Sequence, residues 1–330
     1  MTISLEPTSP TPSGGGGLIT FGETMGLLTA LDVGPLEMSR QFRYGIGGAE
    51  SNVAIGVARL GGSATWFGRV GTDATGDMIE RRLRAEQVTT LAVRDESSPT
   101  GVMIKHHRFA HAGHLDYHRH HSAASRISPD DVPDDAIRQS AILHVTGITP
   151  ALSATAADTV LAAINIARTA GVLISVDINY RRKLWDPEAA APTLRNLASR
   201  ADILFAGPDE AQLVLGIGAG ATAVELATAL TALGPKEAII KNGAHGATAV
   251  IDGQRHRRDA YAVHAIDTVG AGDAFVAGYL TERLNNSSPE GRLETAVRVG
   301  ALAVAVPGDC EGLPRLSDLS VPFISDDVLR

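Results

Sequence analysis

The chain lacks several features that mark special classes of protein. It has one cysteine, Cys310, so neither a disulfide framework nor a cysteine-based zinc site can form within one chain. It has no run of 18 apolar residues, so no membrane-spanning helix is expected. The N-terminus has no basic segment followed by an apolar one, so no secretory signal is expected either. Together these absences predict a cytoplasmic protein in a reducing compartment.

Charge also limits the partners. The chain carries 29 basic and 37 acidic residues, a formal net charge of −8. This balance argues against a broad nucleic-acid surface but leaves room for a local basic pocket. We therefore expect a small-molecule partner, with neither nucleic acid nor membrane.

The length and composition predict an ordinary globular chain. Its 330 residues are 44% hydrophobic, which is too high for general disorder and enough for a large core. Residues 1–17 are rich in Pro, Ser, Thr and Gly and are predicted to form a flexible tail. Residues 18–330 are then predicted to form the folded domain.

The order of sequence patterns predicts the fold class. Short apolar, β-branched runs alternate with helical stretches, as in an α/β protein with a mostly parallel central sheet and helices on both faces. Expected strands are 18–21, 64–67, 142–145, 172–176, 203–205, 238–241 and 247–251. Expected helices are 52–60, 77–86, 154–170, 210–215, 223–233, 274–284 and 293–305.

Two segments break this alternation. Residues 30–46 and 95–121 are more polar, alternate weakly and lack a following helix. Small antiparallel strands outside the main sheet account for such a pattern. We expect them to form a lid over a cleft.

The sharpest motif is the glycine-rich string DTVGAGDAF, residues 267–275. Two glycines and an alanine leave backbone N–H groups uncovered where a helix is expected to begin, which favours an anion site. Asp273, in the first turn of that helix, is placed to accept a proton from a hydroxyl beside this anion. The alternative is a plain glycine-rich turn with Asp273 as the N-cap.

The full string resembles the second signature of the PfkB, or ribokinase-like, sugar kinases. The chain has neither a Walker phosphate loop nor a dinucleotide fingerprint after the first strand. The resemblance implies a ribokinase-like fold and identifies Asp273 as the catalytic base. It also implies a site for an activating monovalent cation, such as K⁺, at Asp267 and Thr268. The implied anion hole consists of the amides of Gly270, Ala271 and Gly272.

An earlier glycine-rich segment, 45–54, matches the family's first signature. Glycines allow a ligand to approach the backbone, and Asn52 offers both a donor and an acceptor. Alone, the segment is equally typical of a loop that enters a helix. The resemblance implies that Gly48 and Asn52 bind sugar hydroxyls.

Three further segments are implied to lie on the nucleotide side. Lys241, Gly243 and Gly246 match a family turn that lies along the nucleotide, although a plain hairpin turn is the alternative. Glu210 keeps one position of the family's N-x-x-E motif, which organises Mg²⁺ and phosphate, whereas Gly207 replaces the Asn. We therefore expect Mg²⁺ to be held mainly by phosphates and waters. Asn179, in the segment 177–182, completes this set.

Three segments are similar to 2-keto-3-deoxygluconate kinases within the family. They are 177–185, 117–125 and 307–312, and the substrate residues that they imply include Tyr117 and Asp309. A sugar acid needs a cation for its carboxylate, which Arg119 or Arg181 can supply. Each arginine is alternatively a solvated surface residue, and Arg181 alternatively faces the nucleotide phosphates. Met103 stands where these kinases have an aromatic residue, a departure that bears on substrate preference.

Seven of the eleven histidines lie between residues 106 and 121. Imidazoles are common metal ligands, but alternation along two lid strands points these rings to different faces. We therefore expect a solvated polar lid, with a metal site or a pH-sensitive lid as alternatives. The seven are His106, His107, His111, His114, His118, His120 and His121.

The resemblance implies an ATP- and Mg²⁺-dependent sugar kinase, with 2-keto-3-deoxygluconate as substrate and its 6-phosphate as product. One alternative is a kinase for a neutral sugar such as fructose or ribose. Another is a non-catalytic sugar-binding protein on the same fold. The resemblance also implies a homodimer through the lid.

Overall fold

The computed structural model describes residues 16–109 and 112–323. Residues 1–15 of the expected flexible tail therefore lie outside the described residues. Its last residue, Gly17, belongs to the fold, because its carbonyl accepts a hydrogen bond of 2.9 Å from the amide of Ala141.

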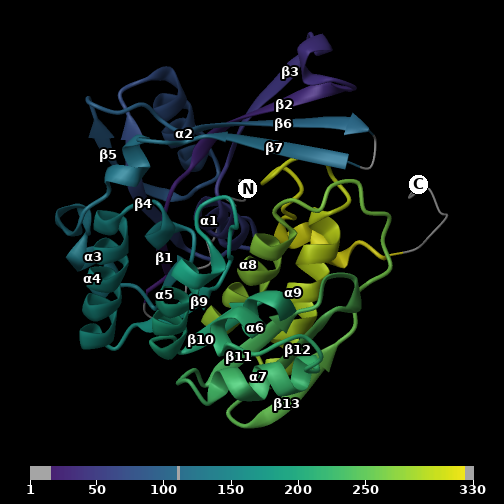
Figure 1. Cartoon of the computed structure of the whole chain (residues 1–330). Coiled ribbons are helices and arrows are strands. Elements are labelled where there is room, and N and C mark those ends of the chain that lie inside the picture. The colour runs from purple at the N-terminus through teal and green to yellow at the C-terminus, as the bar shows by residue number, and fades with distance from the viewer. Residues whose placement is uncertain (1–15, 110–111, 324–330) are drawn as a thin grey trace, which may run out of the picture.

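A nine-stranded central sheet organises the chain (Figure 1), in the order β13-β12-β11-β10-β9-β8-β1-β4-β5. The strands from β5 to β11 in this order are parallel, and β12 and β13 are antiparallel, so the predicted mostly parallel sheet is confirmed. The strands are β1 Leu18–Phe21, β4 Ala64–Gly71, β5 Thr89–Asp95, β8 Ile142–Thr146, β9 Leu173–Asp177, β10 Ile203–Ala206, β11 Glu237–Lys241, β12 Ala247–Ile251 and β13 Gln254–Arg258.

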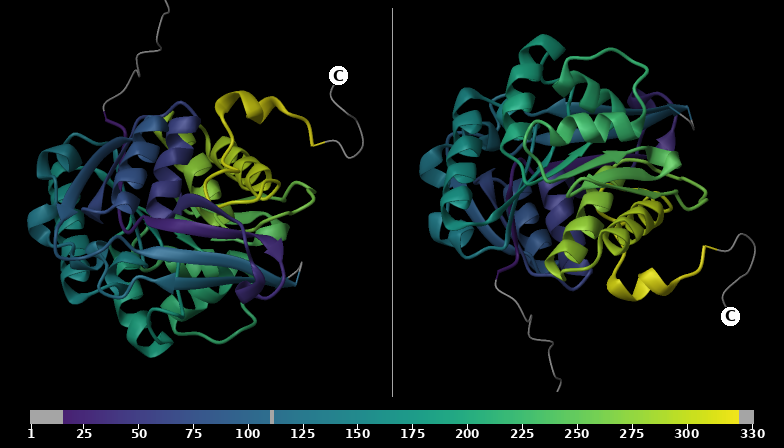
Figure 2. Two further views of the ribbon diagram at one scale, coloured as in Figure 1. Left: turned by 90° about the horizontal axis from the view of Figure 1, so that it is seen from above. Right: turned by 90° about the horizontal axis from the view of Figure 1, so that it is seen from below.

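Helices cover both faces of this sheet, as expected (Figure 2). One hydrophobic core joins the sheet to α1, α2, α8 and α9, and a second joins its other face to α3, α4, α5, α6 and α7. The helices are α1 Ala49–Arg59, α2 Ala74–Ala85, α3 Asp134–Arg138, α4 Ala154–Ala170, α5 Pro187–Ser199, α6 Pro208–Leu215, α7 Ala223–Thr231, α8 Ala271–Leu284 and α9 Pro289–Ala303. Within the described residues, none of them is long and apolar enough to cross a membrane.

Local sequence accounts for these elements. A parallel strand that is buried on both faces needs apolar residues on both. In β1, Leu18 packs into the first core, and Ile19 and Phe21 pack into the second. Helix α4 begins where the Ser153 hydroxyl accepts from the amide of Ala156, at 3.1 Å.

The four-stranded lid sheet stands apart from the central sheet, in the order β3-β2-β6-β7. It carries the predicted lid strands and lies across one end of the central sheet (Figure 1). Its strands are β2 Met25–Val33, β3 Phe42–Gly47, β6 Val102–Phe109 and β7 Ala112–His118.

Several boundaries differ from expectation. The lid sheet begins at Met25 rather than at residue 30, because the apolar run 25–28 pairs with β3 and β6 instead of following β1 into the central sheet. Asp95 ends β5 of the central sheet. Strand β13, which reads QRHRR, has no apolar alternation because it is a solvated edge. Helix α5 was not predicted, since it contains Pro192.

Candidate active site

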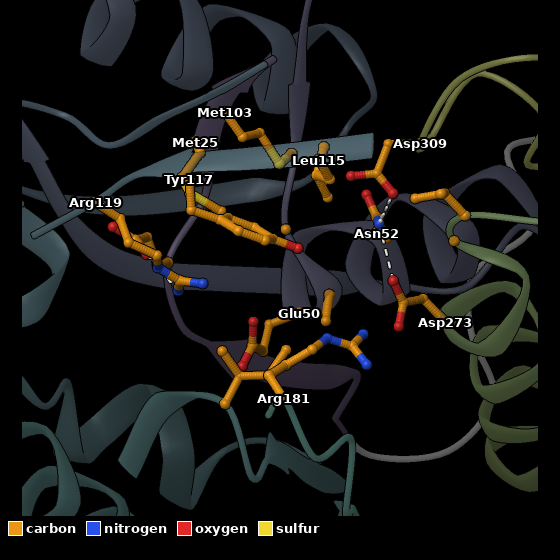
Figure 3. A pocket seen from close by; sticks show the side chains of 16 residues that line it. Met25, Glu50, Asn52, Met103, Leu115, Tyr117, Arg119, Arg181, Asp273 and Asp309 are labelled. Carbon is orange, nitrogen blue, oxygen red and sulfur yellow. Dashed lines mark hydrogen bonds and ion pairs between the residues drawn. The ribbon is translucent and has the colours of Figure 1, made fainter. Parts of the chain in front are cut away.

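The candidate active site is a pocket at the carboxyl ends of the parallel strands, the usual ligand position in open α/β sheets. Helices α1 and α8 supply one wall and the lid sheet another. Figure 3 shows Arg119 and Asp273 on opposite sides of the pocket, with Tyr117 and Arg181 between them. The lining residues are Glu23, Met25, Gly48, Ala49, Glu50, Asn52, Met103, Leu115, Tyr117, Arg119, Ile148, Arg181, Val269, Gly270, Asp273 and Asp309.

The start of α8 has the geometry of an anion site. Gly270 precedes the helix in the left-handed conformation, with φ of 76°. A Cβ at this position would lie 2.3 Å from the carbonyl oxygen of Asp309, so only glycine fits. The first-turn amides of a helix have no intrahelical acceptor, and the helix dipole favours negative charge there. Asp273 lies in this first turn and is 7% exposed.

One amide group connects the buried carboxylate of Asp273 to the partly buried carboxylate of Asp309. The Nδ2 of Asn52, on α1, donates to Asp273 Oδ2 and to Asp309 Oδ1, both at 2.9 Å (Figure 3). Asn179 Nδ2 approaches the other oxygen of Asp273 at 3.4 Å. Asn179 has a φ of 40°, an uncommon conformation for a residue other than glycine that is found more often at functional sites. These contacts fix the Asp273 carboxylate in one orientation.

Burial makes these carboxylates weaker acids than usual. Burial raises the pKa of Asp273 to about 6, although the hydrogen bond from Asn52 and the charge of Arg181 act to lower it. It raises the pKa of Asp309 to about 7, helped by the negative charge of Asp273. Glu50 is also buried, and its pKa rises to about 7 although Thr146 and Thr149 donate to it. The pocket therefore gathers carboxyl groups that titrate near neutral pH.

This cluster predicts a pH-dependent stability effect for Asp309→Asn. The native state binds the Asp309 proton more tightly than the unfolded chain does, so the stabilisation is complete at low pH and is lost as pH rises through about 7. Asparagine cannot ionise. The Tm of the variant is therefore expected to rise relative to wild type between pH 5 and pH 8, measured by differential scanning fluorimetry. A difference that stays constant or falls with pH would contradict the ionisation of Asp309 in the fold.

A buried ion pair lies below the start of α8. Lys241 Nζ, at the end of β11, is 2.6 Å from Asp177 Oδ2, at the end of β9. Burial lowers the pKa of Lys241, but the charges of Asp177 and Glu210 outweigh this, and the net shift is upward. The Nζ also lies 3.5 Å from the position of a Cβ on Gly272, so a fixed cation adjoins the helix N-terminus. Burial, aided by Lys241, lowers the pKa of the neighbouring His144 to about 3, which keeps that ring neutral.

The other residues expected on the nucleotide side have mainly structural contacts. Both Glu210 oxygens accept backbone amides, Oε1 from Tyr180 at 2.9 Å and Oε2 from Gly207 at 2.6 Å. Glu210 therefore holds the turn after β9 against the start of α6. Gly243 and Gly246 lie in the hairpin turn between the antiparallel strands β11 and β12.

The two arginines differ in their partners. Arg119 forms an ion pair with Glu23, which also accepts from the Ser122 hydroxyl. Its Nε is buried and has no acceptor among the described residues. Burial raises the pKa of Glu23, against the attraction of Arg119. Arg181 is exposed at the edge of the same pocket, and its guanidinium has no hydrogen-bond or ion-pair partner in the part of the chain that the structure describes.

The lid sheet supplies the apolar side of the pocket. Met103 is 3% exposed and packs with Met25 and Leu27, with Leu115 and Tyr117 beside them. The Tyr117 ring lies 5.6 Å from the Arg119 guanidinium, and its burial raises the pKa of its hydroxyl. At the position where an aromatic residue was expected, this chain therefore has the flexible side chain of Met103.

Comparison with known proteins identifies the family. The model for the pfkB family of carbohydrate kinases matches residues 17–316. The chain belongs to this family. A curated relative, the 2-dehydro-3-deoxygluconokinase of Bacillus subtilis, is 36% identical over 312 residues, which cover 92% of this chain and 94% of that protein. A fructokinase of Escherichia coli is 34% identical, covering 83% of this chain and 90% of the relative.

Solved structures of pfkB-type kinases confirm the ribokinase-like fold. The crystal structure of the 2-dehydro-3-deoxygluconokinase of Thermotoga maritima has a TM-score of 0.86 and 26% identity, covering 93% of this chain and 97% of that one. A putative ribokinase of E. coli in complex with ATP and Mg²⁺ has a TM-score of 0.84 and 25% identity, covering 92% and 97%. The chain is accordingly a carbohydrate kinase of the pfkB family.

The pocket of this pfkB kinase brings together half of the site residues predicted from sequence. Asp267 lies outside its lining and pairs with Lys105 of β6. The other predicted residues outside the lining are Ala271, Gly272, Asn179, Glu210, Lys241, Gly243 and Gly246. His106 stacks on His114 at 5.2 Å, and the described residues contain no group of three His, Cys, Asp or Glu side chains that could hold a metal ion. His111 lies outside the described residues. The predicted residues that line the pocket are Gly48, Asn52, Tyr117, Arg119, Arg181, Gly270, Asp273 and Asp309.

Sequence reasoning missed several residues of this pocket. Glu50 lies inside the first glycine-rich motif, and this position two residues before Asn52 was the available signal. Glu23 carried no such signal, because its partner Arg119 is 96 positions away in the chain and follows strand β7 of the lid sheet. Lys105, which pairs with Asp267 outside the pocket lining, was likewise hidden among the polar residues of a lid strand.

Proposed function

We propose that this pfkB kinase transfers the γ-phosphate of ATP to the terminal hydroxyl of 2-keto-3-deoxygluconate. The observation that carries the proposal is one pocket with Asp273 on one side and two arginines, Arg119 and Arg181, reaching it from other elements. A neutral sugar needs only hydroxyl partners, whereas a sugar acid needs a cation for its carboxylate.

Asp273 is the proposed base. Its carboxylate accepts the proton of the sugar hydroxyl as that oxygen attacks the phosphate. A pKa of about 6 leaves Asp273 ionised at neutral pH but basic enough to accept a proton. Asn52 and Asn179 orient it. Gly270, Ala271 and Gly272 supply the proposed anion hole for the transferring group.

The start of α8 and Lys241 fit a nucleotide phosphate. An anion there meets both uncovered amides and an ammonium group held by Asp177. Mg²⁺ supplies charge neutralisation on the phosphates when bound. Both oxygens of Glu210 already accept backbone amides, so we propose that phosphates and waters hold the metal. Glu210 is proposed to position Asn179 indirectly, through the backbone of Tyr180. Gly243 and Gly246 are proposed to border the nucleotide through their backbone.

The opposite side of the pocket is proposed to bind the sugar acid. Arg181 brings an unpaired positive charge, and Arg119 keeps a buried Nε donor while Glu23 fixes its orientation. Tyr117, Asp309 and Asn52 present groups for sugar hydroxyls, and Gly48 allows close approach. A Cβ added to Gly48 would lie only 2.5 Å from the Glu23 carbonyl oxygen, so a larger residue does not fit there.

A substrate panel tests this function. ATP turnover, followed by coupled ADP release, is measured with 2-keto-3-deoxygluconate, 2-keto-3-deoxygalactonate, gluconate, fructose and ribose. We expect a keto-deoxy acid to give the highest kcat/KM. A preference for fructose or ribose would keep the kinase and contradict the sugar-acid assignment. Binding of a sugar without turnover of any would favour the non-catalytic alternative.

Arg181→Met separates the two roles open to Arg181. If Arg181 binds the substrate carboxylate, the variant is expected to lose about 10- to 100-fold in kcat/KM for the sugar acid, the equivalent of one charged hydrogen bond. The kcat/KM for fructose should change much less. An equal loss for both substrates would assign Arg181 to the nucleotide phosphates instead. Arg182→Met, a change of the next residue and outside the pocket lining, is the control.

The proposal also includes a homodimer and a location. The lid sheet leaves large apolar side chains exposed on β2, β3 and the loop between them, which supports a homodimer through this sheet. A kinase that consumes ATP is proposed to work in the cytoplasm, with a small-molecule sugar acid as its partner. K⁺ at Asp267 is left out of the proposal, because Lys105 pairs with that carboxylate. The exposed residues are Leu31, Val33, Met38, Phe42 and Tyr44.

A further inference from the structure

The carboxylate expected to bind a monovalent cation is already neutralised by a side chain. Lys105 lies on β6 of the lid sheet and is only 4% exposed. Its Nζ forms an ion pair with Asp267 Oδ2, across 162 positions of sequence. An ammonium ion and a potassium ion carry the same charge, so Lys105 brings to Asp267 the charge that a bound cation would bring.

The remaining contacts of Asp267 leave little for a cation. Its Oδ2 also accepts the amide of Gly308 at 3.0 Å, and its Oδ1 accepts the amide of Val269 at 3.2 Å. A cation at this carboxylate would lie beside the fixed ammonium and be repelled by it. The residues present therefore do not fit a monovalent cation at Asp267.

The position of the pair explains what it does. Asp267 precedes the glycine-rich turn that opens α8. Gly308 precedes Asp309 in the loop that follows α9, residues 304–315, which we call the closing loop. Lys105 also attracts the Asp309 carboxylate. One ammonium group thus joins the lid sheet to both loops that border the proposed anion hole.

We propose that Lys105 replaces the monovalent activator, so that this kinase works without K⁺ and the lid sheet itself supplies the cation. The proposal rests on the proposed kinase function, but binding of K⁺ can be tested apart from catalysis. Lys105 acts as a positioning residue, because it touches the loops around the anion hole rather than the reacting atoms.

The first test uses the wild-type protein. Activity and Tm are compared in KCl and in tetramethylammonium chloride at equal ionic strength. We expect both to be the same, with kcat differing by less than about twofold. A rise of Tm or of kcat specific to KCl, or anomalous density of Tl⁺ at Asp267 in soaked crystals, would overturn the proposal. The Tm and crystal measurements stand even if the sugar substrate has been misassigned.

The second test uses Lys105→Ala, with Lys236→Ala, an exposed lysine outside the pocket, as the matched control. Removal of the ammonium should lower kcat by about 10- to 100-fold through misplacement of the loops, and NH₄⁺ or K⁺ should restore part of it. A loss with no rescue by either ion, or no loss at all, would overturn the proposal. Should Lys105→Ala fail to fold, Lys105→Gln, which keeps most of the side chain's length, replaces it in the same comparison.

Discussion

Asp273→Asn is expected to lower kcat by about 10³-fold, the usual contribution of a positioned proton acceptor. Asparagine has nearly the same shape and can still accept from Asn52, which now reaches Asp273 Oδ2 at 2.9 Å. Binding of sugar and ATP, measured by isothermal titration calorimetry, is therefore expected to change little. Loss of turnover with binding retained is the signature of a base.

Asp309→Asn is the matched control, because Asp309 shares the Asn52 amide and lies in the same pocket. We expect this variant to raise KM more than it lowers kcat. If the two variants lose kcat equally, Asp273 has no special role in proton transfer. The wild type should also lose kcat/KM about tenfold per pH unit below about 6, as Asp273 takes up its proton.

Arg59→Met is expected to have the largest effect on stability, about 3 kcal/mol of the free energy of unfolding, because it breaks a largely buried ion pair and leaves Glu86 with only the more exposed Arg82 as its partner. Arg59 is 9% exposed and donates through Nε and Nη2 to both oxygens of Glu86 at 2.8 Å. Its Nη1 also donates to three carbonyls of the closing loop, including that of Leu313 at 2.6 Å. This loop carries Asp309, so KM for the sugar should rise as well.

Arg82→Met is the control for this stability effect. Arg82 lies 3.2 Å from the same Glu86 carboxylate, but its side chain is 40% exposed. An exposed ion pair of this kind contributes about 0.5 kcal/mol. Urea unfolding at neutral pH measures both variants. Equal losses would show that burial of Arg59 and its three carbonyl contacts add nothing.

The sequence predicted the parts of the fold and site that are local. The glycine-rich string fixes the left-handed turn at Gly270 and the start of α8, so Asp273 could be placed from spacing alone. The alternation of apolar runs likewise predicted the parallel sheet, since each buried strand carries its own signal. The two glycine-rich motifs carried the resemblance to the pfkB family, and the family model that matches residues 17–316 confirms it.

What the sequence did not reveal depends on contacts between distant segments. The pairing of Lys105 with Asp267 changes the expected cation site, and neither residue has a neighbour in sequence that signals it. The pairing of Arg119 with Glu23 changes the charge available to a substrate in the same way. Helix α5 was missed because Pro192 weakens the local signal, while its apolar face, including Leu194, is buried in the second core.

A pair of substrates that differ only at C1 tests the central claim most directly. 2-Keto-3-deoxygluconate has a carboxylate there, and 3-deoxyfructose has a hydroxymethyl group on an otherwise identical chain. Coupled ADP release from the wild-type kinase gives kcat/KM for each. We expect the acid to be preferred by about 10- to 100-fold, the value of one charged hydrogen bond. Equal values, or a preference for 3-deoxyfructose, would contradict a pocket built for a sugar acid.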